Sequence, residues 1–274
     1  MLSRGDRGEM RKNLLLTLTI AALLTAGFAT VAAATKVTSR VGNLVLTFGG
    51  STSPKVLPRT TYTQIASTIF GKIATNDGTH PSAFRETTVD IDKDVKVNVK
   101  GYPTCTEQQL TARDTAAALK VCGSAVVGKG IAHAEIKFPE QPPIPVTSPI
   151  TIFNGGEKGG KVTLLIHTFI TVPAPAAIVT TVAITRKGSG LHTVAKIPVI
   201  AGGSGSVLDF NFKLGKTYSY KGKKVGYVEA RCPDGVFKIS VPKTIFKNEA
   251  REPGAATQTV LNNVRLAIPC TPKG

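Results

Sequence analysis

The sequence has no tryptophan and only two methionines, and aromatic residues make up 6% of its 274 positions. Proteins that bind nucleic acid without sequence preference commonly stack bases on aromatic side chains. A chain with so few aromatic residues is therefore a poor candidate for nucleic-acid binding. Acidic residues are also scarce, with 17 Asp and Glu against 34 Lys and Arg, and no local motif selects two of them as a catalytic pair.

Long apolar runs are missing after the first 34 residues. Residues 1–13 carry a net positive charge, residues 14–26 are uncharged and mostly Leu, Ala, Ile and Thr, and small residues follow up to Ala34. This order is typical of a secretory signal peptide. The apolar core is shorter than the roughly 20 residues of a membrane-spanning helix. We therefore predict cleavage after Ala34, a secreted protein and no membrane span in the mature chain.

The charge of the mature chain is strongly positive. Removing residues 1–34 lowers Lys and Arg from 34 to 30 and Asp and Glu from 17 to 15, which leaves a net charge of +15. A positive surface attracts anionic partners such as cell-wall or other extracellular polymers, and it also keeps a protein soluble. The charges are spread along the chain, so solubility is the simpler interpretation.

The four cysteines all lie in the predicted mature chain. An even number of cysteines in an exported protein indicates disulfide bonds. We favour the pairs Cys105–Cys122 and Cys232–Cys270, because each pair brackets a local unit of the sequence. A zinc site is the weaker alternative, since no C-x₂-C motif occurs and no His lies close to a Cys.

The composition predicts a mainly β protein. Val, Ile and Thr are abundant, and 27 Gly and 17 Pro separate short apolar segments. Such spacing is typical of an antiparallel β-sandwich. The clearest alternation runs from Thr87 to Val99, which we interpret as a β-hairpin with residues 92–94 at its tip.

One short helix is predicted at residues 106–120. Thr106 and Gln109 fit a capping box, the interior is rich in Ala, and Cys105 and Cys122 flank the segment. Residues 139–149 contain five prolines and form the best candidate boundary. It separates an N-terminal β region, 35–140, from a C-terminal β region, 141–274. The alternative is one continuous sandwich.

Motifs for catalysis or for cofactor and metal binding are absent from the sequence. Asp90, Asp92 and Asp94 begin like a calcium loop, but Val95 stands where that loop needs Gly. The four histidines are scattered, and the serines form no G-x-S-x-G motif. We therefore predict no catalytic residue, no metal ligand and no cofactor.

The segment after residue 215 combines tyrosines with lysines. Tyrosines offer stacking area and lysines offer charge, so an anionic polymer could bind here. The candidate residues are Tyr218, Tyr220, Lys221, Lys223, Lys224 and Tyr227. The simpler interpretation is a hairpin whose tyrosines pack and whose lysines are solvated.

Several short motifs between Leu57 and Cys270 resemble those of a group of exported, disulfide-containing, β-rich proteins of soil actinobacteria whose role is uncharacterised. The motifs are Tyr102-Pro103-x-Cys105, Cys122, Val127-Gly128-x-Gly130, Gln141-Pro142-Pro143, Phe153-Asn154-Gly155, Tyr218-x-Tyr220-x-Gly222 and Cys232-Pro233. The resemblance implies export, disulfides and a β fold, and it assigns no site residues.

Together these features predict an exported, non-enzymatic structural or binding protein at or outside the cell surface. The alternative is a secreted hydrolase that acts on a polysaccharide or an ester. Two carboxylates roughly 5–10 Å apart in a polar cleft would favour the hydrolase.

Overall fold

The computed structural model describes residues 35–251, 254 and 256–274. Most of these residues lie in antiparallel β-strands, whose side chains alternate between the two faces of the sheet. Among these residues the main sheet has 12 strands, and every neighbouring pair is antiparallel. The mainly β fold predicted from the sequence is confirmed. The predicted signal peptide, residues 1–34, lies outside the described residues.

The main sheet is continuous from its first strand to its last. In spatial order its strands are β1 (Thr35–Val41), β2 (Leu44–Ser53), β5 (Ala66–Thr75), β13 (Gly205–Leu214), β8 (Val126–Ile136), β9 (Ile144–Lys158), β10 (Lys161–Ile170), β11 (Ala176–Lys187), β12 (Gly190–Lys196), β6 (Ala83–Ile91), β17 (Val236–Lys247) and β18 (Gln258–Pro269). The order mixes strands from both sides of the proline-rich segment.

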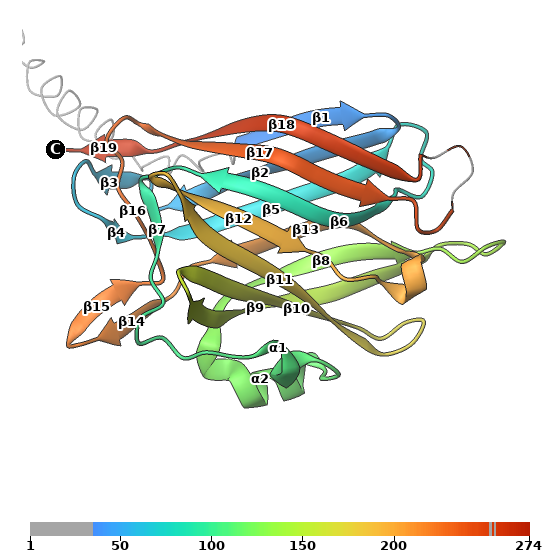
Figure 1. Ribbon diagram of the computed structural model, residues 1–274, viewed down its shortest axis with the longest axis horizontal. Helices are drawn as coiled ribbons and strands as arrows, with labels where there is room; N and C mark the ends of the chain where they lie inside the picture. Colours follow the sequence, from blue (N-terminus) through green and yellow to red (C-terminus); the bar gives the residue numbers. More distant parts are fainter. Residues whose placement is uncertain (1–34, 252–253, 255) are drawn as a thin grey trace, which may run out of the picture. The chain divides into compact units, whose positions relative to one another are not determined.

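The sheet curls until its two edge strands, β1 and β18, lie side by side (Figure 1). Strands β1, β2, β5, β6, β17 and β18 form one layer, and β8–β13 form the facing layer. The two packed layers expected of a sandwich are thus the two halves of one rolled sheet. Register shifts in β8, β10, β13 and β17 mark bulges, which bend strands and increase their twist.

The remaining strands of the described residues form three small sheets. Strands β4 (Thr63–Gln64), β16 (Val228–Ala230) and β7 (Val95–Val97) form an antiparallel trio, and β14 (Thr217–Tyr220) pairs with β15 (Lys223–Gly226). Strands β19 (Thr271–Lys273) and β3 (Val56–Pro58) pair in parallel.

The predicted hairpin at residues 87–99 is wrong. Strand β6 pairs with β12 and β17 in the main sheet, whereas β7 pairs with β16 in the small trio. Residues 92–94 therefore form a corner between two sheets instead of a solvated tip. Asp94 is only 2% exposed at this corner and accepts a hydrogen bond from Arg231 Nε at 2.7 Å.

The helical segment between Cys105 and Cys122 is confirmed, although it is divided. Helix α1 (Glu107–Leu110) has the predicted capping box of Thr106 and Gln109. The backbone of Ala112 then takes a positive φ of 61°, which ends the helix. Asp114 accepts a hydrogen bond from Ala117 N and begins α2 (Thr115–Cys122), which the 3₁₀ turn η1 (Gly123–Ala125) follows.

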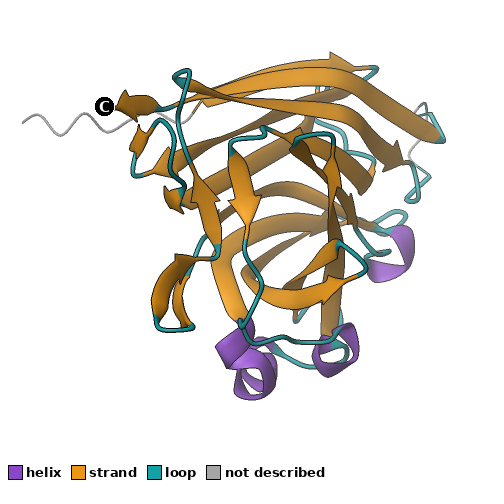
Figure 2. Cartoon of the chain, turned by 60° about the vertical axis from the view of Figure 1, so that its left-hand side comes forward, coloured by secondary structure: helices purple, strands orange, loops and turns teal. Residues whose placement is uncertain are grey.

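Both helices pack on the outer side of β9 and β10, away from the inside of the roll (Figure 2). Their contact is a buried apolar cluster that joins Leu110, Ala118 and both cysteines to Phe153 and Leu165. A second 3₁₀ turn, η2 (Ala201–Gly203), precedes β13. The inner face of the roll remains free of helices, and this face holds the candidate site among the described residues.

Candidate functional site

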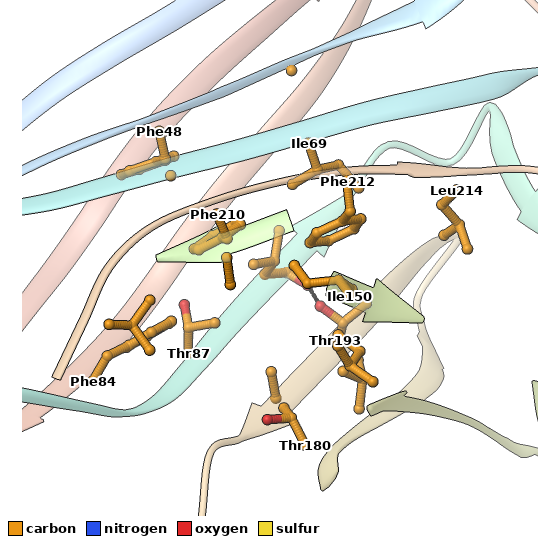
Figure 3. Close-up of a pocket in the computed structure, with 18 of the residues that line it drawn as sticks. Phe48, Ile69, Phe84, Thr87, Ile150, Thr180, Thr193, Phe210, Phe212 and Leu214 are labelled. Atoms are coloured by element: carbon orange, nitrogen blue, oxygen red, sulfur yellow. Dashed lines mark hydrogen bonds between the residues drawn. The ribbon is translucent and has the colours of Figure 1, made fainter. Parts of the chain in front are cut away.

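The inside of the rolled sheet contains a cavity of about 410 Å³. Successive side chains of a strand point to opposite faces, so every second residue faces inward. On β10 the inward residues are Leu164, Ile166, Thr168 and Ile170, while Leu165 packs outward under the helices. Figure 3 shows side chains of several strands converging on this space.

The surface of the lining is mainly apolar, although serines and threonines also border it. Large side chains such as Phe48, Ile69, Phe84, Phe210 and Phe212 border the cavity from four strands (Figure 3). Each of them remains partly exposed. The rings of Phe210 and Phe212 stack with their centroids 5.9 Å apart. The cavity wall is thus apolar surface that the protein's own packing leaves uncovered.

Small residues on the inner face leave the space open. On β8, Ala132 and Ala134 border the cavity, and Gly128 and Gly130 precede them at period two. On β5, a Cβ at Gly71 would lie 2.6 Å from the ring of Phe210, so that ring lies against bare backbone. A Cβ at Gly130 would likewise meet Phe212, whereas larger side chains at Ala132 and Ala134 would extend into the cavity.

Most polar groups on the wall are already hydrogen-bonded within the protein. Thr193 donates to the carbonyl of Val89 at 3.0 Å, and the hydroxyls of Thr87 and Thr244 bond to each other at 3.0 Å. Ser148 donates to the carbonyl of Phe169 at 2.9 Å. These bonds lower the cost of placing hydroxyls in an apolar wall.

The β4–β16–β7 trio closes part of the cavity. Val95 and Val97 of β7 and Val228 of β16 belong to its lining. The ion pair between Asp94 and Arg231 joins the residues that flank β7 and β16. Because the Asp94 carboxylate is buried, loss of its cationic partner would leave an uncompensated charge. The ion pair therefore holds β7 and β16 together at this side of the cavity.

The cysteines pair as the sequence predicts. Cys105 is bonded to Cys122 and Cys232 to Cys270, with Cα–Cα distances of 5.6 Å and 6.1 Å. Both bonds lie outside the cavity lining. Disulfides of this kind indicate an oxidising compartment.

The predicted tyrosine–lysine surface is divided by the fold. Lys221, Lys223 and Lys224 are exposed at the turn of the β14–β15 hairpin. Tyr218 donates a hydrogen bond to the carbonyl of Lys100 at 3.0 Å, and the ring of Tyr220 covers Gly101. Burial, together with the charge of Glu229, raises the pKa of Tyr218, so its phenol stays neutral.

Tyr227 does not belong to that surface. Its side chain is 0% exposed, so the prediction that it contributes to an exposed patch is wrong for this residue. It follows β15 directly and turns inward, where its ring packs edge-on against Tyr102 at 5.3 Å. The exposed part of the predicted surface is therefore cationic, and its tyrosines pack largely on the protein itself.

The histidines and the aspartate motif make local structural contacts. Three histidines pair with acids on separate parts of the sheet, His80 with Glu135, His133 with Asp209, and His192 with Asp90. His167 is buried beneath the helices, where its Nε2 donates to the carbonyl of Arg113 at 2.9 Å. Within the described ranges, no group of three or more His, Cys, Asp or Glu is placed to hold a metal ion.

Comparison with known proteins identified no relative of the chain. No protein-family model, curated protein or solved structure matches the chain. No helix of the described part of the chain is long and apolar enough to cross a membrane. The candidate site is therefore defined by the geometry of the cavity.

Sequence reasoning missed this cavity, although one signal for it was present. Inward residues on a strand are normally large, because they fill a core. The period-two series from Gly128 to Ala134 departs from that rule, and its last two members border the cavity. Such a series marks a wall that leaves room beside it, once the strand is known to lie in a curled sheet.

Proposed function

We propose that the chain is an exported binding protein that holds an apolar small molecule inside its rolled sheet. The observation that carries this proposal is the 410 Å³ cavity with its apolar wall. Its volume lies within the range of roughly 300–1,000 Å³ that is typical of ligand pockets. Pockets of this class are lined mainly by hydrophobic and aromatic side chains, as this one is.

The energetics of the interior favour occupation. The large apolar side chains that border the 410 Å³ cavity are only partly covered by the protein's own packing. A molecule that fills the cavity buries this apolar surface together with its own, which is favourable.

Hydrolysis is the alternative function considered from the sequence, and the cavity lends it less support. The described residues that line the cavity include no carboxylate and no histidine. Ser206 lies opposite Glu135 of the His80–Glu135 pair, and its hydroxyl donates to the carbonyl of Pro81. The apolar wall suits retention of a ligand better than general acid–base chemistry.

A titration with a neutral apolar fluorophore tests the binding function. N-phenyl-1-naphthylamine becomes strongly fluorescent in an apolar environment. We expect saturable enhancement with one site for each chain, and displacement of the fluorophore by a medium-chain hydrocarbon. A linear, unsaturable signal would contradict the proposal.

Export is the second part of the proposal. The disulfides support it because they persist in oxidising compartments. The signal-peptide pattern of residues 1–34 supports it independently. Expression of the full chain followed by N-terminal sequencing of the protein in the medium should give Thr35 as the first residue. Retention of the whole chain inside the cell would contradict export.

A separate role in binding anionic extracellular polymers is supported by the exposed lysines of the β14–β15 hairpin. Lys221, Lys223 and Lys224 lie within four residues and are all exposed. We expect the chain to sediment with an anionic cell-wall polymer at low salt and to be released at high salt. Replacing the three lysines by Ala should reduce sedimentation, with Lys129→Ala, Lys137→Ala and Lys158→Ala as a charge-matched control.

A further inference from the structure

We propose that the ligand of the cavity is an uncharged amphiphile: a hydrocarbon body that carries a hydroxyl or carbonyl group, held by the hydroxyl of Thr180. This inference rests on the proposed binding function and specifies the chemical class of the ligand. It follows from the charge of the cavity wall and from the hydroxyls on it that lack protein partners.

The wall offers no charge to a ligand. Among the described residues that border the cavity, Lys72 is the only charged one. Lys72 occupies an exposed position between the inward residues Gly71 and Ile73 of β5, so its side chain is on the outer face. A carboxylate or ammonium group inside would have no counter-charge, and burying an unpaired charge is costly.

The wall does offer hydrogen bonds. Of the inward hydroxyls, those of Thr87, Ser148, Thr168, Thr193 and Thr244 are already bonded within the protein. The hydroxyls of Thr52, Ser67 and Thr180 make no hydrogen bond with another described residue. The interior therefore retains unused hydrogen-bonding capacity in neutral groups.

Thr180 is better placed than Thr52 for contact with a ligand, and Ser67 lies opposite Thr52 near the start of β5. Thr180 lies on β11 opposite Ile166 of β10, its side chain is partly exposed, and Figure 3 shows it at the cavity wall. The Thr52 side chain is 8% exposed and its hydroxyl oxygen is fully buried. The hydroxyl of Thr180 is not fully buried, so it is more accessible to a ligand in the cavity than that of Thr52.

The first test compares three probes of equal chain length on the wild-type protein. Decanol, decanoate and decane are each used to displace N-phenyl-1-naphthylamine at about pH 8, where decanoate is ionised. We expect decanol to bind at least ~10-fold more tightly than decanoate, because the carboxylate loses its hydration without gaining a cation. Equal or tighter binding of decanoate would overturn the inference.

The second test assigns the hydrogen bond to Thr180. Thr180→Val keeps the β-branched shape and removes the hydroxyl. It should weaken decanol binding by about 3- to 10-fold, the effect of one lost neutral hydrogen bond, and leave decane binding within about twofold. Thr193→Val is the matched control, because the hydroxyl of Thr193 is already used by Val89.

The outcomes separate the two proposals. If none of the three probes displaces the fluorophore from the wild-type protein, the binding function itself fails. If all three bind and Thr180→Val changes decanol and decane alike, the binding function stands and the role of Thr180 is refuted. Thermal denaturation of both valine variants shows whether the comparison is between folded proteins.

Discussion

The hydroxyl of Tyr227 donates a hydrogen bond to Oδ1 of Asn154 across 2.9 Å, and both side chains are 0% exposed. Asn154 Oδ1 also accepts from the backbone N–H of Gly156, and Asn154 Nδ2 donates to the carbonyl of Pro103 at 2.9 Å. This amide therefore joins β9, the segment before Cys105 and the segment after β15. Burial raises the pKa of Tyr227 far above its ordinary value, so the phenol remains the donor.

Removing this hydroxyl should destabilise the fold modestly. Tyr227→Phe loses one buried neutral hydrogen bond, and we expect the free energy of unfolding to fall by about 1 kcal/mol. Urea denaturation measures this fall in the free energy of unfolding. Tyr220→Phe is the matched control and should change stability by less than about 0.5 kcal/mol. An equal loss in both variants would show that the Tyr227–Asn154 bond is not the cause.

His167 should make stability depend on pH. Burial lowers its pKa, while the hydrogen bond to the Arg113 carbonyl and the charge of Asp114 offset part of the effect. In the unfolded chain the pKa is about 6.5, so the unfolded state takes up the proton first as the pH falls. The contribution of His167 is therefore complete above pH 6.5 and declines as the pH falls through 6.5 towards the lower pKa of the folded state.

Denaturation of the wild type and His167→Gln at about pH 7.5 and pH 5.5 checks this dependence. The wild type should lose more stability between the two pH values than the variant, which keeps an amide donor but does not titrate. An identical pH dependence would assign the effect to other groups.

The two disulfides should differ in their contribution to stability. Their sequence separations are 17 and 38 residues. In the chain-entropy model these loops correspond to about 3 and about 4 kcal/mol. Replacing Cys232 and Cys270 by Ser should therefore lower the free energy of unfolding more than replacing Cys105 and Cys122. Denaturation of the two double variants measures both losses. A larger loss in the variant without Cys105 and Cys122 would contradict the model.

Thr52→Val should stabilise the ligand-free protein. Thr52 is 8% exposed, and its hydroxyl has no partner within the described residues. A buried unsatisfied polar group costs about 1–3 kcal/mol, and valine replaces it with a methyl group of similar size. We expect stability to rise by about 1 kcal/mol in thermal denaturation. A clear loss of stability would mean that the hydroxyl is hydrogen-bonded in solution.

Local signals in the sequence predicted local structure well. The capping box at Thr106 and Gln109 depends on neighbouring residues, and it forms as predicted. The cysteine pairs close local units and were also predicted. The division of the helix was missed, because it depends on the positive φ of Ala112 and on Asp114 acting as a second cap.

The sequence did not indicate which strands far apart in the chain pair with each other. The alternation from Thr87 to Val99 is genuine, yet the residues of β6 pair with residues 100 or more positions away and not with β7. Inward and outward faces are likewise defined only when the sheet curls. That is why Tyr227 was placed at the surface, and why the small residues of β8 could not be read as the wall of a cavity.

The most direct measurement of the central claim uses two neighbouring residues of β8 that point to opposite sides. Ala132 faces the cavity, whereas Ile131 is 42% exposed on the outer face. We predict that Ala132→Phe weakens binding of N-phenyl-1-naphthylamine by at least ~10-fold because the ring occupies the ligand's space, and that Ile131→Phe leaves binding within about twofold. Unchanged binding in a folded Ala132→Phe protein, or an equal loss in both variants, would contradict a ligand site inside the rolled sheet.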